Sequence, residues 1–319
     1  MALAVRGALE DAQIPLVEVD GLFAATAVHS MAAVSLAEYL GIQPAFSNGS
    51  NIGGSSFMAH ALTAAMAIEA GVCQVAVIAY GSNQRTAGGF KSMSEAMPFE
   101  AIYEPRSPIT AYALAASRYM HEFGATREDL AEVAVAARAW AQLNPEAFTR
   151  DPLTVADVLS ARMVSDPFGK LDCCLVTDGA AAMVLTAKDR AKHTPKVPVY
   201  LLGAGMAHRH RMISTMPDLT TTATVESGAR AFEMAGYGAN DMDTLQLYDA
   251  FTINPLLFLE DLGLCAKGEA KEFIKGGRIA PGGPLPVNTN GGGLSCVHPG
   301  MYGMFVMIEA IRQIRAARG

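Results

Sequence analysis

The sequence predicts an α/β fold in which helices cover the faces of a parallel or mixed sheet. Of its 319 residues, 51% are hydrophobic and only 7% aromatic, with abundant Ala, Gly and Met, a composition that suits close packing of helices on sheets. Helical and extended segments follow one another repeatedly, and this order restarts after a polar linker at residues 188–196. Because one core rarely serves so long a chain, we expect two packed α/β units or one domain of two similar halves.

The first half begins with a helical segment and then alternates. Apolar periodicity predicts helices at 3–12, 30–40 and 55–70, and extended segments at 19–23, 74–79 and 178–187. The apolar stretch 61–80 is interrupted by Glu69, Gly71 and Gln74, so it reads as a helix followed by a strand and not as a membrane span. The alternation of helices and strands is interrupted at residues 81–167, where Gly and Pro residues precede two amphipathic helices at 110–123 and 127–142. This interruption indicates an insertion.

The second half repeats this order. We expect a strand at 199–204, a helix at 225–234, a strand at 245–247, a helix at 252–262, a Gly-rich loop, and a helix at 301–317. The similar order suggests a duplicated α/β unit. The predicted division is therefore residues 1–190 for the N-terminal half, with its insertion at about 81–167, and residues 191–319 for the C-terminal half.

Charge and cysteine usage exclude several classes of protein. The net charge is −7 and the basic residues are scattered, so neither nucleic acid nor a membrane surface is expected as a partner. The five cysteines form no CxxC pair and lie near no histidine at metal-ligand spacing, which argues against a disulfide framework and a metal site; they are Cys73, Cys173, Cys174, Cys265 and Cys296. The N-terminus lacks a signal-peptide pattern, and we expect a cytoplasmic protein.

Four segments, taken in order, resemble the thiolase superfamily, in the branch related to sterol carrier protein thiolases. Each segment alone is a weak signal, but their order and spacing together are specific. The segments are Asn-Ile-Gly-Gly-Ser-Ser at 51–56 before an Ala-rich helix, Thr-Asp-Gly-Ala-Ala at 177–181, Leu-Tyr-Asp-Ala-Phe at 247–251 followed by residues 259–265, and Asn-Thr-Asn-Gly-Gly-Gly at 288–293 leading to His-Pro-Gly at 298–300.

The resemblance implies two repeated halves in five layers, α-β-α-β-α, that work as a homodimer on coenzyme A thioesters. The insertion at 81–167 corresponds to the loop domain of the family. Relative to the family, the first strand and the closing strands are missing from this sequence, and we expect a fold without them. The position of the nucleophilic cysteine of the family is occupied here by Gly54.

A glycine cannot supply the thiolate that a helix N-terminus would favour. Ser55 follows Gly54 at the start of the predicted helix, and N-capping is the commoner role of serine there, although a part in the site stays open. Backbone N–H groups near Gly53 and Gly54 are expected to form a pocket for the thioester oxygen. The resemblance adds Asn288 and Gly292 to this pocket.

His298 and Tyr248 are the candidate catalytic residues. An isolated loop histidine is usually solvent-exposed, but the resemblance implies that His298 lines the active site as a hydrogen-bond donor or base. Tyr248 reads either as a half-buried packing residue or as a site residue at a strand end. Steroid side-chain aldolases of thiolase fold, which also lack the nucleophilic cysteine, place a tyrosine in this motif and a second one at the position of His298; Tyr302 lies one turn farther on.

Two further residues are candidates. Asp249 belongs to the motif around Tyr248, and Cys296 lies two residues before His298. For Cys296, as for Cys265, the favoured interpretation is a small apolar core residue. We predict that Tyr248 and His298 face one another across a single cavity with Gly53 and Gly54 at its floor.

The sequence therefore predicts an enzyme that makes or breaks a carbon–carbon bond next to a coenzyme A thioester, of retro-aldol or Claisen type, without an acyl-enzyme. Coenzyme A is expected only as part of the substrate, with no tightly bound cofactor and no metal. One alternative is an acetyl-CoA acyltransferase that uses another thiol. The other is a non-catalytic subunit that passes acyl-CoA to a partner of the OB-fold and zinc-ribbon type.

Overall fold

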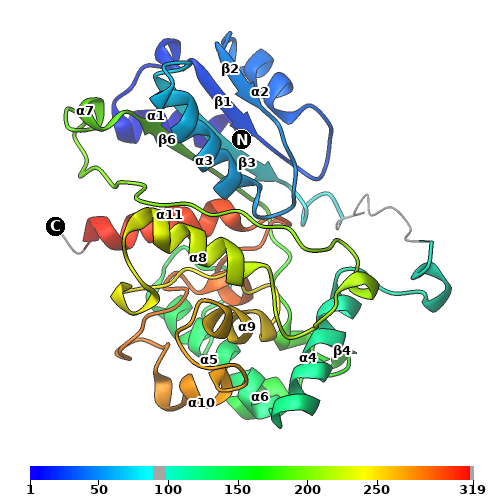
Figure 1. Ribbon diagram of the computed structural model, residues 1–319. Helices are drawn as coiled ribbons and strands as arrows, with labels where there is room; N and C mark the ends of the chain where they lie inside the picture. Colours follow the sequence, from blue (N-terminus) through cyan, green and yellow to red (C-terminus); the bar gives the residue numbers. More distant parts are fainter. Residues whose placement is uncertain (89–97, 317–319) are drawn as a thin grey trace. The chain divides into compact units, whose positions relative to one another are not determined.

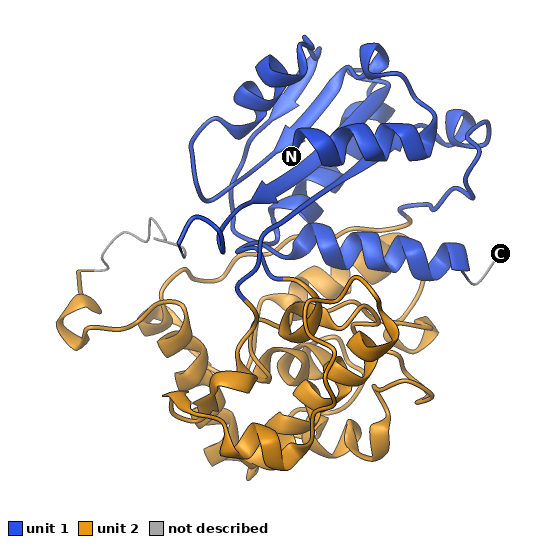
Figure 2. Cartoon of the chain, turned by 180° about the vertical axis from the view of Figure 1, so that it is seen from behind, with its two compact units in different colours: residues 1–93, 176–201, 298–319 blue, residues 94–175, 202–297 orange. Residues whose placement is uncertain are grey.

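The computed structural model describes residues 1–88 and 98–316, which form two compact units (Figure 2). Unit 1 comprises residues 1–93, 176–201 and 298–319, and unit 2 comprises residues 94–175 and 202–297. The two units are defined by which residues pack together. The predicted halves 1–190 and 191–319 were instead defined by a repeated order of elements, and this division stays a prediction. Residues 89–97 of the predicted insertion lie outside the described residues.

Unit 1 is built on a four-stranded sheet of order β2-β1-β3-β6 (Figure 1). Its strands are β1 (Gly21–Ala24), β2 (Phe46–Asn48), β3 (Val75–Ser82) and β6 (Gly179–Thr186). The first three strands are parallel, and β6 runs antiparallel to β3, from Val75 opposite Thr186 to Ser82 opposite Gly179. The sheet is therefore mixed, as the sequence predicted.

Helices cover both faces of this sheet. One face packs on α1 (Ala2–Ala12) and α2 (Ala32–Leu40), and the other on α3 (Ser56–Glu69) and α11 (Gly303–Ala316). Successive strand residues point to opposite faces, so Val75 and Val77 join the first core while Ala76 and Ile78 join the second. The short α7 (Lys188–Ala191) follows β6. Unit 1 is thus a three-layer α-β-α sandwich.

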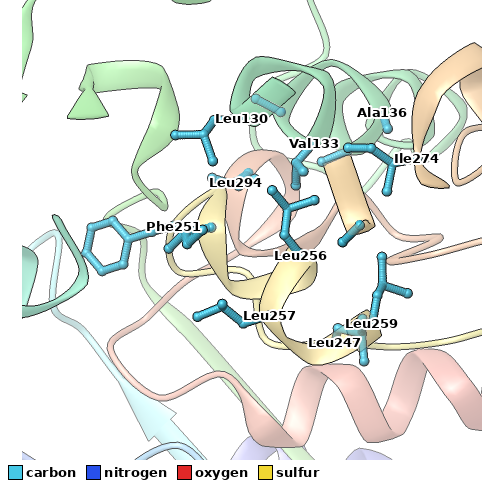
Figure 3. Packing of buried hydrophobic residues seen from close by; sticks show 14 of the residues in the cluster. Leu130, Val133, Ala136, Leu247, Phe251, Leu256, Leu257, Leu259, Ile274 and Leu294 are labelled. Carbon is cyan, nitrogen blue, oxygen red and sulfur yellow. The ribbon is translucent and has the colours of Figure 1, made fainter. Parts of the chain in front are cut away.

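Unit 2 is largely helical, and its main core lies around α9 (Figure 3). Its helices are α4 (Ile109–Phe123), α5 (Arg127–Leu143), α6 (Val155–Ser160), α8 (Thr224–Ala235), α9 (Ile253–Asp261) and α10 (Ala270–Phe273). A two-stranded sheet joins β4 (Met163–Ser165) to β5 (Phe168–Gly169). Leu256 and Leu259 of α9 are fully buried. A largely buried helix of this kind is held firmly by the packing around it.

Short helical turns complete the described part of the chain, residues 1–88 and 98–316. Six are 3₁₀ turns and one is a π turn, at Leu16–Glu18, Ala101–Tyr103, Lys170–Asp172, Ile213–Thr215, Ala239–Asp241, Lys275–Gly277 and, for the π turn, Gly292–Cys296. No helix in residues 1–88 and 98–316 is long and apolar enough to cross a bilayer.

Most predicted elements are confirmed within one or two residues, including both helices of the insertion and the helix-to-strand interpretation of 61–80. The final helix begins at Gly303 instead of 301, because Met301 and Tyr302 belong to the preceding loop. Its expected end at 317 lies outside the described residues. The sequence did not predict β2, whose three residues are only partly buried.

The strand expected at 199–204 is wrong, because the structure has no strand there. From residue 203 the segment lies against α8, and a Cβ atom on Gly203 would come 2.7 Å from the backbone N of Ala235. The glycine allows the chain to approach the helix, and a strand forms only where a neighbouring strand accepts its hydrogen bonds. The strand expected at 245–247 is likewise wrong, since only an isolated bridge joins Leu245 to Val287.

Candidate functional site

The turn that resembles the nucleophile loop is fixed by its own polar side chains in unit 1. Ser56 Oγ donates to the carbonyl of Gly53 at 2.7 Å and accepts from the N–H of Ile52 at 2.9 Å. Asn51 Oδ1 accepts from the N–H of Gly53 at 3.0 Å, and its Nδ2 donates to the carbonyl of Thr26 at 3.2 Å. Gly53 has φ +81°, a conformation that favours glycine. The turn is therefore rigid.

Ser55 does not cap α3 as expected. It occupies the N-cap position, but its side chain makes no capping hydrogen bond, and its backbone is in the right-handed helical region with φ −76° and ψ −5°. A capping side chain requires an extended backbone at that position. The neighbouring Ser56 holds the turn instead.

Gly54 packs against the start of α11. A Cβ atom on Gly54 would lie 3.4 Å from the backbone N of Tyr302, an ordinary van der Waals contact. A Cβ atom on Gly303 would overlap the carbonyl oxygen of Gly54. The close approach thus depends on Gly303, whereas position 54 has room for a Cβ atom.

His298 is buried and held through its backbone. The N–H of His298 donates to Thr177 Oγ1 at 3.1 Å, and the N–H of Thr177 donates to the carbonyl of His298 at 3.2 Å. The imidazole stacks on the ring of Tyr302, with centroids 6.0 Å apart and an interplanar angle of 28°. Burial lowers the pKa of His298 to about 4. The ring is therefore neutral near pH 7, where it can donate or accept a hydrogen bond, and the lowered pKa makes it a weaker base than a free imidazole.

Tyr80 fixes the turn that follows His298. Its hydroxyl donates to the carbonyl of Pro299 and accepts from the N–H of Met301 at 3.1 Å. Between these two residues lies Gly300, whose φ of +98° favours glycine. Tyr80 itself is buried at the end of β3, and burial raises its pKa to about 12. The phenol therefore stays protonated and links the sheet of unit 1 to the histidine loop.

In unit 2, the side chain of Asn288 accepts a hydrogen bond from the next segment at the point where the backbone pairing of residues 245 and 286–288 ends. Leu245 donates to the carbonyl of Pro286 at 3.0 Å, and Asn288 donates to the carbonyl of Leu245 at 2.9 Å. The backbone of Asn288 then turns away with φ +53°, while its Oδ1 accepts from the N–H of Leu247 at 2.7 Å. Asn288 therefore positions the segment that leads to Tyr248. Its predicted contact with the thioester stays a prediction.

Asp249 connects the tyrosine motif to the glycine loop. Its fully buried carboxylate accepts from the N–H groups of Gly293 at 2.6 Å and Leu294 at 3.4 Å. Gly292 has φ +66°, and a Cβ atom there would overlap Asp249 Oδ2 and lie 2.7 Å from Cγ. Burial raises the pKa of Asp249 to about 7 against the lowering effect of these hydrogen bonds. The carboxylate therefore orders the π turn Gly292–Cys296.

Tyr248 itself is half-buried at the edge of the unit 2 core. The residues that follow it, Ala250 and Phe251, are buried in that core. This placement agrees with both interpretations of Tyr248, and its catalytic role stays a prediction.

Four of the five cysteine thiols are poor nucleophiles by their surroundings. Burial raises the pKa of Cys173 and Cys265 to about 12, and also raises that of Cys73 and Cys174. Cys296 is buried with Ala141 and Ala147, and Asn144 Nδ2 lies 3.5 Å from its Sγ. Since the thiolate is the reactive form, these surroundings suit small core residues better than an acyl carrier.

The structure therefore assembles two clusters from the predicted residues. Unit 1 brings the Gly54 turn, Tyr302 and His298 together, and unit 2 brings Asp249, Asn288 and Gly292 together. The predicted meeting of Tyr248 with His298 joins the two units and stays a prediction. The sequence analysis did not predict the supporting roles of Tyr80 and Ser56. The signal that could have indicated them is a polar residue near the end of a buried strand for Tyr80, and a polar residue at the start of a helix for Ser56.

Comparison with known proteins identifies the family. A family model, Thiolase C-terminal domain-like, matches residues 205–319. The chain is 35% identical to the 17-hydroxy-3-oxo-4-pregnene-20-carboxyl-CoA lyase of Mycobacterium tuberculosis, over 98% of this chain and 85% of the relative. The chain belongs to the thiolase superfamily. Within it, the chain lies in the sterol-carrier-type branch related to steroid side-chain aldolases.

Two further matches agree with this thiolase assignment. The chain is 34% identical to a steroid side-chain-cleaving aldolase of Thermomonospora curvata, over 98% of this chain and 84% of the relative. A solved structure, described as an Ltp2-ChsH2(DUF35) aldolase, superposes with a TM-score of 0.89 and 33% identity, covering 98% of this chain and 83% of the other. The thiolase fold and the membership in a family of enzymes are therefore confirmed.

Proposed function

We propose that this thiolase-superfamily protein is an acyl-CoA lyase that cleaves the carbon–carbon bond next to the thioester by a retro-aldol reaction, without an acyl-enzyme. The observation that carries the proposal is Gly54. By the resemblance to the family it stands at the position of the nucleophilic cysteine, although the space beside it admits a Cβ atom. The partly buried Cys173 and Cys265, whose pKa values are raised, argue against a substitute thiol.

The proposed reaction begins with a β-hydroxyacyl-CoA. A base removes the proton of the β-hydroxyl, the oxygen electrons form a carbonyl, and the Cα–Cβ bond breaks with its electron pair passing to the thioester as an enolate. A proton added at Cα then releases the shortened acyl-CoA together with a ketone or aldehyde. The protein must supply one base and donors for the enolate oxygen.

Tyr248 and His298 are the proposed groups for proton transfer. The neutral imidazole of His298 can donate a hydrogen bond to the enolate near pH 7, and with its lowered pKa it would act on the hydroxyl proton only as a weak base. Of the two backbone donors expected in the turn, the N–H of Gly53 is already bonded to Asn51 Oδ1. The N–H of Gly54 is therefore the proposed donor to the thioester oxygen.

The related proteins support the reaction class and suggest a partner. Two relatives are named for lyase or aldolase action on steroid compounds, one of them a coenzyme A ester, and we extend the chemistry to this chain. The solved aldolase contains ChsH2, described as DUF35. We propose that this chain likewise works with a small partner, of the OB-fold and zinc-ribbon type, and as a homodimer.

Intact-mass measurement and product analysis test the function together. After incubation with acetyl-CoA or acetoacetyl-CoA, the mass of the protein should be unchanged, while a β-hydroxyacyl-CoA is converted to a shorter acyl-CoA and a carbonyl product. A stable acyl adduct on a cysteine or serine would instead support an acyltransferase. Inactivity both alone and with a copurified partner would support a non-catalytic subunit.

A further inference from the structure

Unit 2 contains a cavity of about 450 Å³. Its wall comes from α4, α9 and the segment 210–223, and every lining residue belongs to unit 2. Its volume lies in the range of small-molecule sites. Apolar side chains dominate where the helices face it, including Ala111, Tyr112, Ala115, Leu257 and Phe258.

Three polar residues of the wall are bonded within the protein, and the segment 210–223 adds the basic side chains of His210 and Arg211. Asn254 Oδ1 accepts from the N–H of Phe251 at 3.1 Å, and Thr222 Oγ1 donates to Asp261 Oδ2 at 2.7 Å. Glu100 Oε1 accepts from the N–H of Ser214 at 2.9 Å. Because these three groups are satisfied and α4 and α9 contribute mainly apolar side chains, the part of the cavity between the two helices favours an apolar group.

The cavity adjoins the tyrosine motif. Tyr112 of its wall packs on Phe251, with ring centroids 4.7 Å apart. Phe251 lies three residues after Tyr248 and belongs to the same buried cluster as the base of α9. A ligand in the cavity would therefore contact Tyr112, whose ring packs against Phe251 of the segment that contains Tyr248.

We propose that this cavity receives the apolar acyl group of the substrate, of the size of a ring system, and that Ala111 limits its size. This rests on the proposed function, since it assigns the acyl-binding part of the same site. Ala111 and Ala115 lie one turn apart on the cavity face of α4. Their single methyl groups leave the space open, so a larger side chain at 111 takes volume from the ligand.

Binding measurements on a graded series test the proposal without requiring catalysis. The variants are Ala111→Val and Ala111→Leu, and the control is Ser117→Leu, which adds similar bulk at an exposed position of the same helix. The probes are cyclohexylacetyl-CoA, which has no β-hydroxyl and cannot be cleaved, and acetyl-CoA. Titration calorimetry gives both dissociation constants for each protein.

We expect Ala111→Leu to weaken binding of cyclohexylacetyl-CoA by about tenfold or more, since single methylene differences in an apolar pocket change affinity by about 10- to 200-fold. The affinity of Ala111→Val for cyclohexylacetyl-CoA should lie between those of the wild type and Ala111→Leu. The affinity of both variants for acetyl-CoA should change by less than about twofold, because the added side chain does not reach the small acetyl group. Ser117→Leu should match the wild type.

Equal weakening of both probes, an unchanged affinity for the cyclic probe, or the same effect from Ser117→Leu would overturn the proposal. So would a wild-type protein that binds the cyclic probe no more tightly than acetyl-CoA. These outcomes are independent of the lyase reaction. A protein that discriminates between the probes as expected but cleaves no carbon–carbon bond would refute only the proposed function.

Discussion

Replacing Gly292 with alanine should disrupt the contact between Asp249 and the glycine loop. The new Cβ would overlap Asp249 Oδ2 and lie 2.7 Å from Cγ, so the carboxylate must move away from the N–H groups of Gly293 and Leu294. A buried donor left without its partner costs about 1–3 kcal/mol. Loss of one bond therefore predicts a destabilisation of about 1–3 kcal/mol, and loss of both about 2–6 kcal/mol, in addition to backbone strain.

Gly276 provides a matched control for this strain. Its φ of +67° is almost that of Gly292, +66°, and a Cβ atom on Gly276 would meet no atom within 4 Å. Gly276→Ala should therefore show only the cost of a left-handed backbone with a side chain, about 1–2 kcal/mol. The difference between the two variants measures the displacement of Asp249.

Trp140 gives a convenient assay, because it is the one tryptophan of the sequence and belongs to unit 2. Its Nε1 donates to the carbonyl of Ile279 at 2.9 Å, so its fluorescence follows unfolding of that unit. With a urea dependence of about 1–3 kcal/mol per M, Gly292→Ala should have a midpoint about 1–2 M below that of Gly276→Ala. Equal midpoints would refute the structural role assigned to Asp249.

Three further predictions concern unit 1. Gly54→Cys should form an acyl adduct with acetyl-CoA that intact-mass spectrometry detects, because position 54 has room and lies just before α3; an unmodified variant would contradict this. Tyr80→Phe should lower kcat for carbon–carbon cleavage about tenfold with little change in KM, as expected for a misplaced acid–base group; an unchanged kcat would exclude a positioning role. Because the folded-state pKa of His298 is about 4, below its unfolded value of 6.5, its contribution to stability is present above pH 6.5 and is lost as pH falls toward 4. Urea titrations monitored by circular dichroism should show this loss in the wild type and less of it in His298→Gln; parallel curves would contradict it.

Local patterns in the sequence determined the longer helices, three of the four strands in the sheet of unit 1, and the absence of a thiol at position 54. A helix or a buried strand depends mainly on side-chain periodicity over neighbouring residues, which is why α3, α5 and β3 were predicted closely. The order of the motifs along the chain likewise indicated its family. These properties are encoded within short stretches of chain.

Only the tertiary structure decided which groups hold the candidate residues in place. Tyr80 bonds to a turn more than 200 residues away, and the meeting of Asp249 with Gly293 depends on how buried segments pack. The segment 199–204 had the composition of a strand but lacks the pairing of one. Hydrogen bonds between distant segments form only where packing brings a donor to an acceptor, and side-chain periodicity carries no information about that partner.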